Sequence, residues 1–264
     1  MYYRSRGLIL KNMDLREADQ LVTIFTEQAG KIKAVAKGSK KPRSSLRGCI
    51  QPFCHSQLFF SSGRDLDLIT QGKILDFYGN TREDFDRTLY ALYILELLDK
   101  SLMDRVALPG LYLRSIAVLD VLNQSGYIPL VIRYFEMSLL GSLGYNPILD
   151  HCVKCENTKA ALLGMDMTEG GMLCSSCMHQ GEHVFVLSPE TLALARMLQK
   201  ANIKAMSRVR ASETALKQLE ILLERYLEYH LERRFKMKNT MRTLKKIMPS
   251  RDVNNKNESK YSDA

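Results

Sequence analysis

Four of the chain's six cysteines form two Cys-x-x-Cys pairs in one short stretch. Cys152 pairs with Cys155 and Cys174 pairs with Cys177, with eighteen residues between the pairs. Each pair can point two thiolates at one ion, and two facing pairs complete the tetrahedron that zinc prefers. Four thiolates also saturate the ion and leave no open position for a substrate. The spacing therefore predicts one structural Zn²⁺ site.

A redox centre is an alternative use of the same cysteines. A thioredoxin-like centre needs only one pair, placed at the start of a helix in a strand–helix–strand unit, and neither pair is expected to have that setting. His151 and His179 could each replace a neighbouring cysteine as a ligand, although exposed loop histidines are the simpler interpretation. Cys49 and Cys54 are too few for a second site and are expected to act as small apolar residues of a strand.

A second chemical feature is a run of cations between Gln28 and Gly63 that contains no carboxylate. An ordinary solvated surface mixes both signs, so this segregation predicts a site for a phosphate backbone. Strand alternation should send Lys31, Lys33 and Lys37 outward and the apolar residues between them inward. The Ser-rich loop that follows is expected to be flexible. The candidate polyanion-binding residues are Lys31, Lys33, Lys37, Lys40, Lys41, Arg43 and Arg47.

Two further groups of residues have roles that the sequence leaves open. Aromatic side chains of the same region could stack on bases, but aromatics in strands more often belong to the core. They are Tyr2, Tyr3, Phe53, Phe59 and Phe60. A later basic stretch could complement the negative end of the last helix or extend the positive path. It comprises Arg233, Arg234, Lys236, Lys238, Arg242, Lys245 and Lys246.

The sequence contains no recognisable catalytic motif. It has no Gly-x-x-x-x-Gly-Lys-Ser/Thr phosphate loop, no Gly-x-Gly-x-x-Gly fingerprint and no Gly-x-Ser-x-Gly elbow. Asp65 and Asp67 alternate with leucines and fit the polar face of a strand. The net charge of +9 favours a polyanionic partner. A binding protein is thus favoured over an enzyme.

Two kinds of element must position these residues. Short apolar segments separated by turn residues predict a small barrel of five strands, at Gly7–Lys11, Gln20–Thr26, Lys31–Ala36, Cys54–Phe60 and Asp65–Thr70. From Thr81, where Thr81 to Asp84 resembles a capping box, the period becomes helical. Further helices are expected at Gly110–Asn123, at Pro129–Leu143, after Ser188 and, as one long helix, at Ser212–Phe235.

These elements predict an α+β protein with a barrel domain at 1–80, a helical domain at 81–248, a cysteine insertion at 150–182 and a disordered tail at 249–264. An apolar content of 45% fits a globular chain. No stretch approaches the roughly 18 apolar residues of a membrane span, and the start does not read as a signal peptide. A cytoplasmic location is expected, where thiols stay reduced and free to bind a metal.

Taken together, the chain resembles the bacterial RecO family of DNA repair and recombination mediators. The resemblance spans nearly the whole chain, and the order and spacing of four stretches make it specific. They are Arg6-Gly-Leu-Ile-Leu10, Val35-Ala-Lys-Gly-Ser-Lys-Lys-Pro-Arg43, Leu46-Arg-Gly48 followed by Gln51-Pro52, and Gly144-Tyr-Asn-Pro147 before Cys152.

The resemblance implies a five-stranded OB-fold barrel followed by an α-helical domain with an inserted four-cysteine zinc ribbon. It also implies a non-enzymatic mediator, found at the nucleoid, that binds single- and double-stranded DNA and anneals complementary strands. By this resemblance the seven basic residues from Lys31 to Arg47 named above are the DNA-binding residues. RecR, RecF and the single-strand binding protein would be its partners in loading RecA. A groove of the helical domain would take the acidic, Phe-ending tail of the single-strand binding protein. Some family members lack the four cysteines, which supports a structural zinc.

Two other functions remain as alternatives. OB-folds and zinc ribbons recur in RNA-binding and transcription-associated proteins, and a fold does not fix a function. A preference for DNA over RNA of matched sequence would separate that class from a recombination mediator. The remaining alternative is a thiol-dependent enzyme that uses one Cys-x-x-Cys pair.

Overall fold

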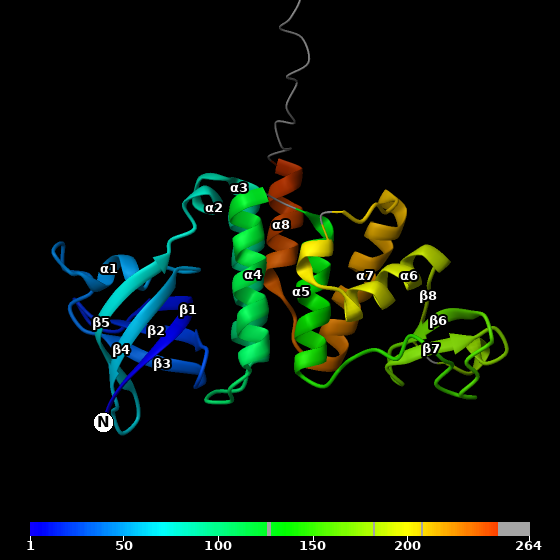
Figure 1. Cartoon of the computed structure of the whole chain (residues 1–264), viewed down its shortest axis with the longest axis horizontal. Helices are drawn as coiled ribbons and strands as arrows, with labels where there is room; N and C mark the ends of the chain where they lie inside the picture. Colours follow the sequence, from blue (N-terminus) through cyan, green and yellow to red (C-terminus); the bar gives the residue numbers. More distant parts are fainter. Residues whose placement is uncertain (126–127, 182, 207, 248–264) are drawn as a thin grey trace, which may run out of the picture.

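The computed structural model describes residues 1–125, 128–181, 183–206 and 208–247. Three parts follow one another along the molecule: a β-barrel, a bundle of helices and a small three-stranded sheet (Figure 1). The predicted α+β class is confirmed. The predicted tail at 249–264 lies outside the described residues.

The barrel consists of five strands, and its predicted form is confirmed. The strands close in the order β1-β2-β3-β5-β4, with β3 and β5 parallel and the other neighbours antiparallel, which is the OB-fold arrangement. A short helix, α1 (Leu46–Cys49), connects β3 to β4. The strands are β1 (Tyr2–Asp14), β2 (Gln20–Thr26), β3 (Gly30–Ala36), β4 (His55–Ser61) and β5 (Asp67–Asp76).

Alternating apolar residues fill the inside of the barrel. Ile24, Ile32 and Leu58 are fully or almost fully buried there and belong to one apolar cluster. Cys49 and Cys54 lie in the same cluster, and burial raises the pKa of both thiols. The prediction that these two cysteines act as small apolar residues is confirmed, because a buried thiol in such a cluster behaves as a hydrophobe. Their predicted place in a strand is wrong, since Cys49 ends α1 and Cys54 directly precedes β4.

The helical domain begins with a one-turn helix that the sequence did not predict. Thr81 does not cap the next helix but lies within α2 (Gly79–Glu83). Asp84 caps α3 instead, since its side chain accepts a hydrogen bond from the backbone N–H of Arg87 at 2.9 Å. The remaining helices are α3 (Phe85–Ser101), α4 (Pro109–Ser125), α5 (Pro129–Ser142), α6 (Pro189–Lys200), α7 (Glu213–Leu231) and α8 (Lys236–Ile247).

The long helix predicted at Ser212–Phe235 is shorter than expected. It ends at Leu231, because Glu232 adopts the left-handed conformation with φ of 49°. The chain then turns back as α8, which packs against α3. Glu96 of α3 accepts hydrogen bonds from the backbone N–H groups of Lys236 and Met237, at 2.9 and 2.8 Å, and so caps the start of α8.

The small sheet is inserted between α5 and α6 and packs on the bundle. Its strands β6 (Leu162–Asp166), β7 (Gly171–Cys174) and β8 (Val184–Val186) lie in the order β7-β6-β8. Met165 and Met172 of this sheet are buried in the apolar core of the helices. One face of the sheet therefore shares the core of the bundle.

The barrel also shares that core along one side. Leu8, Leu10 and Phe25 point from the barrel into the helical core, where Phe25 meets Tyr112 of α4 edge to face at 5.6 Å. The loop after α3 continues this contact, since Arg105 N–H donates to the carbonyl of Lys31 at 2.8 Å. Part of the outside of the barrel is thus covered by protein. Within the described ranges, no helix is long and apolar enough to cross a membrane.

Candidate metal centre and nucleic-acid surface

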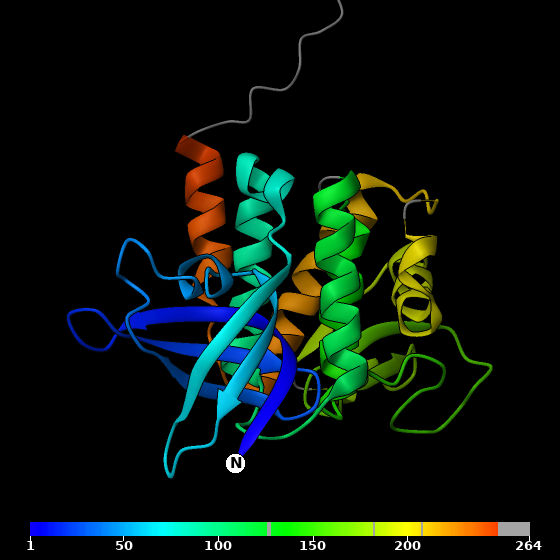
Figure 2. The same ribbon diagram turned by 60° about the vertical axis from the view of Figure 1, so that its left-hand side comes forward.

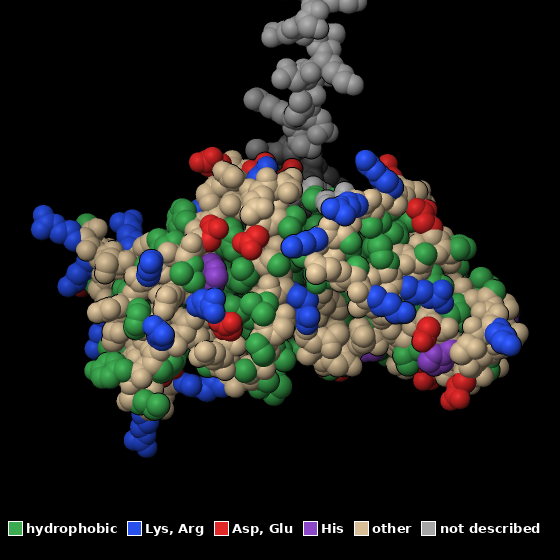
Figure 3. All heavy atoms as spheres, viewed as in Figure 1, with side chains coloured by type: hydrophobic (Ala, Val, Ile, Leu, Met, Phe, Trp, Pro, Cys, Tyr) green, Lys and Arg blue, Asp and Glu red, His purple; other side chains and the backbone are tan. Residues whose placement is uncertain are grey.

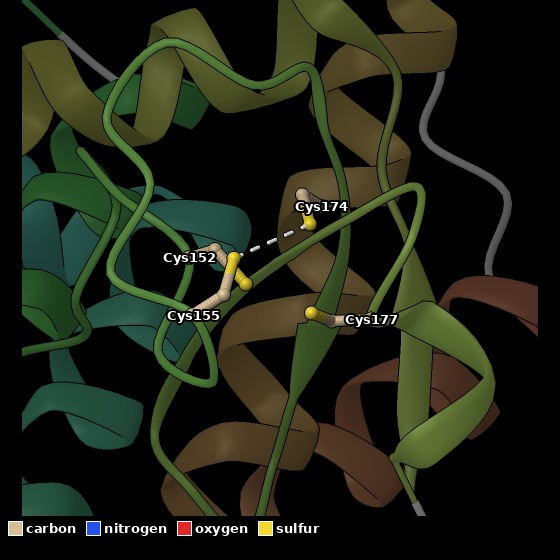
Figure 4. Close-up of side chains that lie close together, drawn as sticks. All are labelled: Cys152, Cys155, Cys174 and Cys177. Carbon is tan, nitrogen blue, oxygen red and sulfur yellow. Dashed lines mark hydrogen bonds between the residues drawn. The ribbon is translucent and has the colours of Figure 1, made fainter.

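The four paired cysteines converge on one point. Their sulfur atoms all lie within 4.8 Å of one another, and the side chains point toward a common centre (Figure 4). The Sγ atoms of Cys155 and Cys174 are 3.8 Å apart. Four sulfurs bound at about 2.3 Å around one tetrahedral ion would be about 3.8 Å from one another. The geometry therefore fits a single four-coordinate metal ion.

Two tight turns present these thiols. Glu156 N–H donates to the carbonyl of Cys152 at 2.8 Å, and Cys177 N–H donates to that of Cys174 at 3.1 Å, so each pair closes on itself. Glu156 has a φ of 56°, which reverses the chain directly after the first pair. Cys155 is exposed and the other three cysteines are buried.

The electrostatics of the cluster also favour a cation. Burial opposes ionisation of the Cys152 thiol, but hydrogen bonds from the backbone around Cys174, Cys155 and Lys154 outweigh it and lower its pKa to about 6. By contrast, a hydrogen bond with the neighbouring thiol of Cys174, together with burial, raises the pKa of Cys177 to about 12. The protein thus favours the thiolate of Cys152 and disfavours that of Cys177. A bound metal ion would supply the missing positive charge.

The basic loop between β3 and β4 is held in place by the neighbouring β1–β2 hairpin. Gly38 N–H donates to Asp19 Oδ1 at 2.8 Å, and Lys40 N–H donates to the carbonyl of Ala18 at 3.1 Å. The buried hydroxyl of Ser39 donates to Gln20 Oε1 at 3.0 Å. The start of a loop expected to be flexible is therefore anchored, and it presents its cations from a defined position.

The seven predicted DNA-binding residues fall into two groups. Lys and Arg side chains project from the barrel end of the molecule (Figure 3), and four of the seven are exposed and have no ion pair with another described residue. Lys40 is also exposed and pairs with Asp14 at 2.7 Å, which lowers the pKa of that carboxyl. The four are Lys37, Lys41, Arg43 and Arg47.

Lys31 and Lys33 point outward from the barrel but toward the helical domain. The Lys31 ammonium is mostly buried, donates to the carbonyl of Asp99 at 2.7 Å and lies 3.3 Å from the carboxylate of Asp104. Lys33 lies 3.7 Å from the same carboxylate. Both charges therefore serve the contact between the barrel and the helices, which leaves five of the seven residues for a DNA surface.

Two cations of the later basic stretch, Lys238 and Arg242, are paired with acids. Lys238 is only 5% exposed and lies within 4 Å of carboxylates of Glu136, Glu220 and Glu224. Arg242 also pairs with Glu224. This part of the stretch ties α8 to α5 and α7. The side chains of Lys245 and Lys246 lie outside the described part of the chain.

Two protein-family models match the chain, one over the barrel and one over the region after it. The family model described as "Recombination protein O N terminal" matches residues 1–78, which contain the barrel. The model described as "Recombination protein O C terminal" matches residues 82–239. The chain belongs to the RecO family.

Curated relatives match over nearly the full length of both chains. The DNA repair protein RecO of Syntrophomonas wolfei is 59% identical over 249 residues, covering 94% of this chain and 99% of the relative. That of Desulforamulus reducens is 31% identical over 253 residues, covering 96% and 98%. That of Moorella thermoacetica is 33% identical over 240 residues, covering 89% and 88%.

Within the region matched by the RecO N-terminal model, the structure separates the five aromatics. Tyr3 stacks on the buried Phe60 with ring centroids 4.8 Å apart, and Phe53 is buried under the guanidinium of Arg82 at 4.0 Å. Tyr2 and Phe59 are exposed. Two exposed cations near them, Arg4 and Lys73, were missed because they lie outside the acid-free window. Only the pairing of strands brings them together.

Proposed function

We propose that this RecO-family chain is a non-enzymatic, DNA-binding mediator of DNA repair and recombination, acting in the cytoplasm at the nucleoid. The observation that carries the proposal is the anchored loop with its exposed cations Lys37, Lys41, Arg43 and Arg47, which have no ion pair within the described residues. Such cations bind phosphates and release counterions, which supplies most of the affinity of sequence-independent DNA binding. Lys40 adds a fifth positive charge once its partner Asp14 is outcompeted.

The proposed activity is binding of single- and double-stranded DNA and annealing of complementary strands. Two strands repel each other through their phosphates, and a protein surface that neutralises both lowers this repulsion. The loop residues do this without recognising bases, so annealing should not depend on sequence. Nucleotide hydrolysis has no part in this mechanism.

Protein partners form the second part of the proposal. RecR, RecF and the single-strand binding protein would act with this chain in loading RecA. A cavity of about 390 Å³ in the helical domain suits the acidic, Phe-ending tail of the single-strand binding protein. Tyr90, Ile221 and Met241 line its apolar part, and Lys217 lies at the same cavity to meet a carboxylate. The lining residues Arg242 and Glu220 are already paired, with Glu224 and Lys238 respectively.

The metal proposed for the four cysteines is one structural Zn²⁺. Thiolates at tetrahedral spacing select zinc over harder cations such as magnesium. Its role here is to hold the two turns of the inserted sheet together. A site saturated by four thiolates leaves no position for a substrate, so the ion is assigned no chemical step.

The test is single-stranded DNA binding across a salt series. A variant with Lys37, Lys40, Lys41 and Arg43 changed to Ala should show a flatter salt dependence than the wild type, by about 0.7 log units per log salt for each lost phosphate contact. A matched control removes the same charge from exposed cations elsewhere: Lys159, Lys200, Lys204 and Arg208. This control should keep the wild-type slope.

Three outcomes would count against the proposal. Salt-insensitive binding by the wild type would remove the phosphate contacts. Equal slopes for the two variants would remove the loop as their source. Tighter binding to RNA than to DNA of matched sequence would favour the RNA-binding alternative.

A further inference from the structure

Strand pairing builds two rows of side chains on the outside of the barrel. Ser5 and Leu58 point inward and are buried, so their neighbours along β1 and β4 point outward. The pairings of β1 with β4 and of β4 with β5 then fix which residues lie side by side. The first row is Arg4, Phe59 and Gln71, and the second row is Arg6, Gln57 and Lys73.

These rows carry positive charge and no carboxylate. Arg4 and Lys73 are exposed and have no ion pair with any described residue, while Arg6 pairs with Glu27 at 3.0 Å. Gln57 and Gln71 are neutral and can both donate and accept hydrogen bonds. A polyanion that approaches Arg4 and Lys73 meets no carboxylate of these rows, and Glu27 beside the second row is paired with Arg6.

An aromatic ring stands in the middle of the first row. Phe59 is 36% exposed, although its chain neighbours Leu58 and Phe60 are fully buried. Tyr2, at the end of the same face, is 79% exposed and lies opposite Ser61, one outward position away from Phe59. Diagonal neighbours of this kind are roughly 7–8 Å apart, so the two rings can contact the same ligand.

The helical domain leaves this face open. It covers the other half of β1, where Leu8 and Leu10 enter the helical core, and the start of β4, where His55 Nε2 lies 2.9 Å from Tyr112 Oη. The N-terminal half of β1 runs beside the β4–β5 hairpin away from the helices (Figure 2). The part of this face that the helices leave open carries the two rows and Tyr2.

We propose that this face of β1, β4 and β5 is a second binding site, for single-stranded nucleic acid. Unpaired bases stack on Phe59 and Tyr2, and Arg4 and Lys73 hold the flanking phosphates. Stacking on exposed aromatics combined with phosphate contacts is the general mode of sequence-independent single-strand binding. The inference rests on the proposed DNA-binding function and adds a surface on which bases stack, which the basic loop lacks.

The basic loop leads directly into helix α1, which contacts β5. A Cβ placed on Gly48 of α1 would lie 3.2 Å from Ile74 Cδ1, and one placed on Gly72 would lie 3.0 Å from Cys49. The short helix α1, which carries the exposed Arg47, therefore packs against β5 at Gly72 and Ile74, the chain neighbours of Lys73. Two neighbouring surfaces, one binding phosphates alone and one also stacking bases, allow the barrel to hold two strands at once.

The absence of tryptophan from the chain makes stacking directly measurable. Phe59→Trp introduces a single tryptophan whose fluorescence should be quenched when an oligo(dT) strand binds. Phe85→Trp is the matched control, because Phe85 is 47% exposed but lies at the start of α3. An abasic strand of equal length, which keeps the phosphates, should leave the Phe59→Trp signal unchanged.

Affinity gives the second measurement. Phe59→Ala should weaken oligo(dT) binding roughly fivefold or more and leave binding of the abasic strand unchanged, and Phe59→Tyr should restore it. If the wild type binds oligo(dT) with a steep salt dependence while Phe59→Trp is not quenched and Phe59→Ala binds normally, this inference fails and the proposed function stands. If the wild type does not bind oligo(dT), both fail.

Discussion

The barrel and the four-cysteine sheet lie on opposite sides of the helical bundle (Figure 1), and they differ in what stabilises them. The barrel closes around an apolar cluster of its own, which includes Ile9, Ile24 and Phe60. The four-cysteine region has a small apolar cluster that is separate from the core of the bundle. Its buried residues are Leu173, Cys152, Cys174 and Cys177. A unit this small cannot bury enough apolar area to fold alone, so metal coordination or docking must stabilise it.

This comparison separates two kinds of binding chemistry. The core of the barrel consists of apolar side chains, so its loop and outer strands can carry exposed cations without contributing to that core. In the sheet, the chemically reactive side chains are themselves the structural core. Changes at its cysteines should therefore alter stability before they alter DNA binding, and changes at the basic loop should do the reverse.

Losing the metal should give the largest effect. Cys174→Ser removes a buried ligand, and because structural zinc contributes about 10 kcal/mol or more in small metal-dependent folds, we expect the sheet to unfold locally. Hydrogen exchange should show fast exchange in β6 and β7 and unchanged protection in β2 and β3. Bound zinc should fall from one ion per chain to none.

The matched control for that variant is Cys49→Ala in the barrel. Cys49 is buried but lies outside the metal cluster, so zinc should stay bound. Because Met165 and Met172 belong to the helical core, the bundle should also lose part of its stability in Cys174→Ser. If the barrel also lost its exchange protection in Cys174→Ser, the stability of the barrel would depend on the four-cysteine sheet.

Truncating the barrel core should give the next largest effect. Leu58 is fully buried among apolar side chains, so Leu58→Ala should cost about 2–5 kcal/mol of unfolding free energy, measured in denaturant. Zinc content should not change. Leu66→Ala, at an exposed position of the β4–β5 hairpin, should cost much less. Loss of zinc from Leu58→Ala would mean that the stability of the barrel and metal binding by the four-cysteine sheet are coupled.

The parts of the fold that depend on neighbouring residues could be predicted from the sequence. Alternating apolar residues gave the five strands, and the Cys-x-x-Cys spacing gave a cluster that the structure brings together. Both patterns are local. The break between α7 and α8 was missed because Glu232 adopts a left-handed conformation without the glycine or proline that usually marks such a turn.

The residues that depend on tertiary contacts could not be predicted. Alternation correctly placed Lys31 on the outside of the barrel, but it does not reveal what covers the outside, and Asp99 and Asp104 of the helical domain do. The sequence left the role of the basic stretch around Lys238 open, and the structure buries Lys238 among glutamates of two helices. That Arg4 lies beside Phe59 could be known only from the register in which β1 pairs with β4.

The smallest effect is expected where the sheet docks on the bundle. Tyr226 donates its hydroxyl to the carbonyl of Gly170 at 3.2 Å, and Gly170 has a φ of 68° in the turn between β6 and β7. Tyr226→Phe keeps the ring packing and removes one hydrogen bond, which costs about 1 kcal/mol. The loss should appear as faster amide exchange at Ile148, whose N–H donates to the same carbonyl, with zinc still bound. Tyr229→Phe, which removes an exposed bond to Thr168, should change this exchange less. If Tyr226→Phe released zinc, docking and metal binding would be one cooperative unit, and the sheet would depend on the bundle as much as on its cysteines.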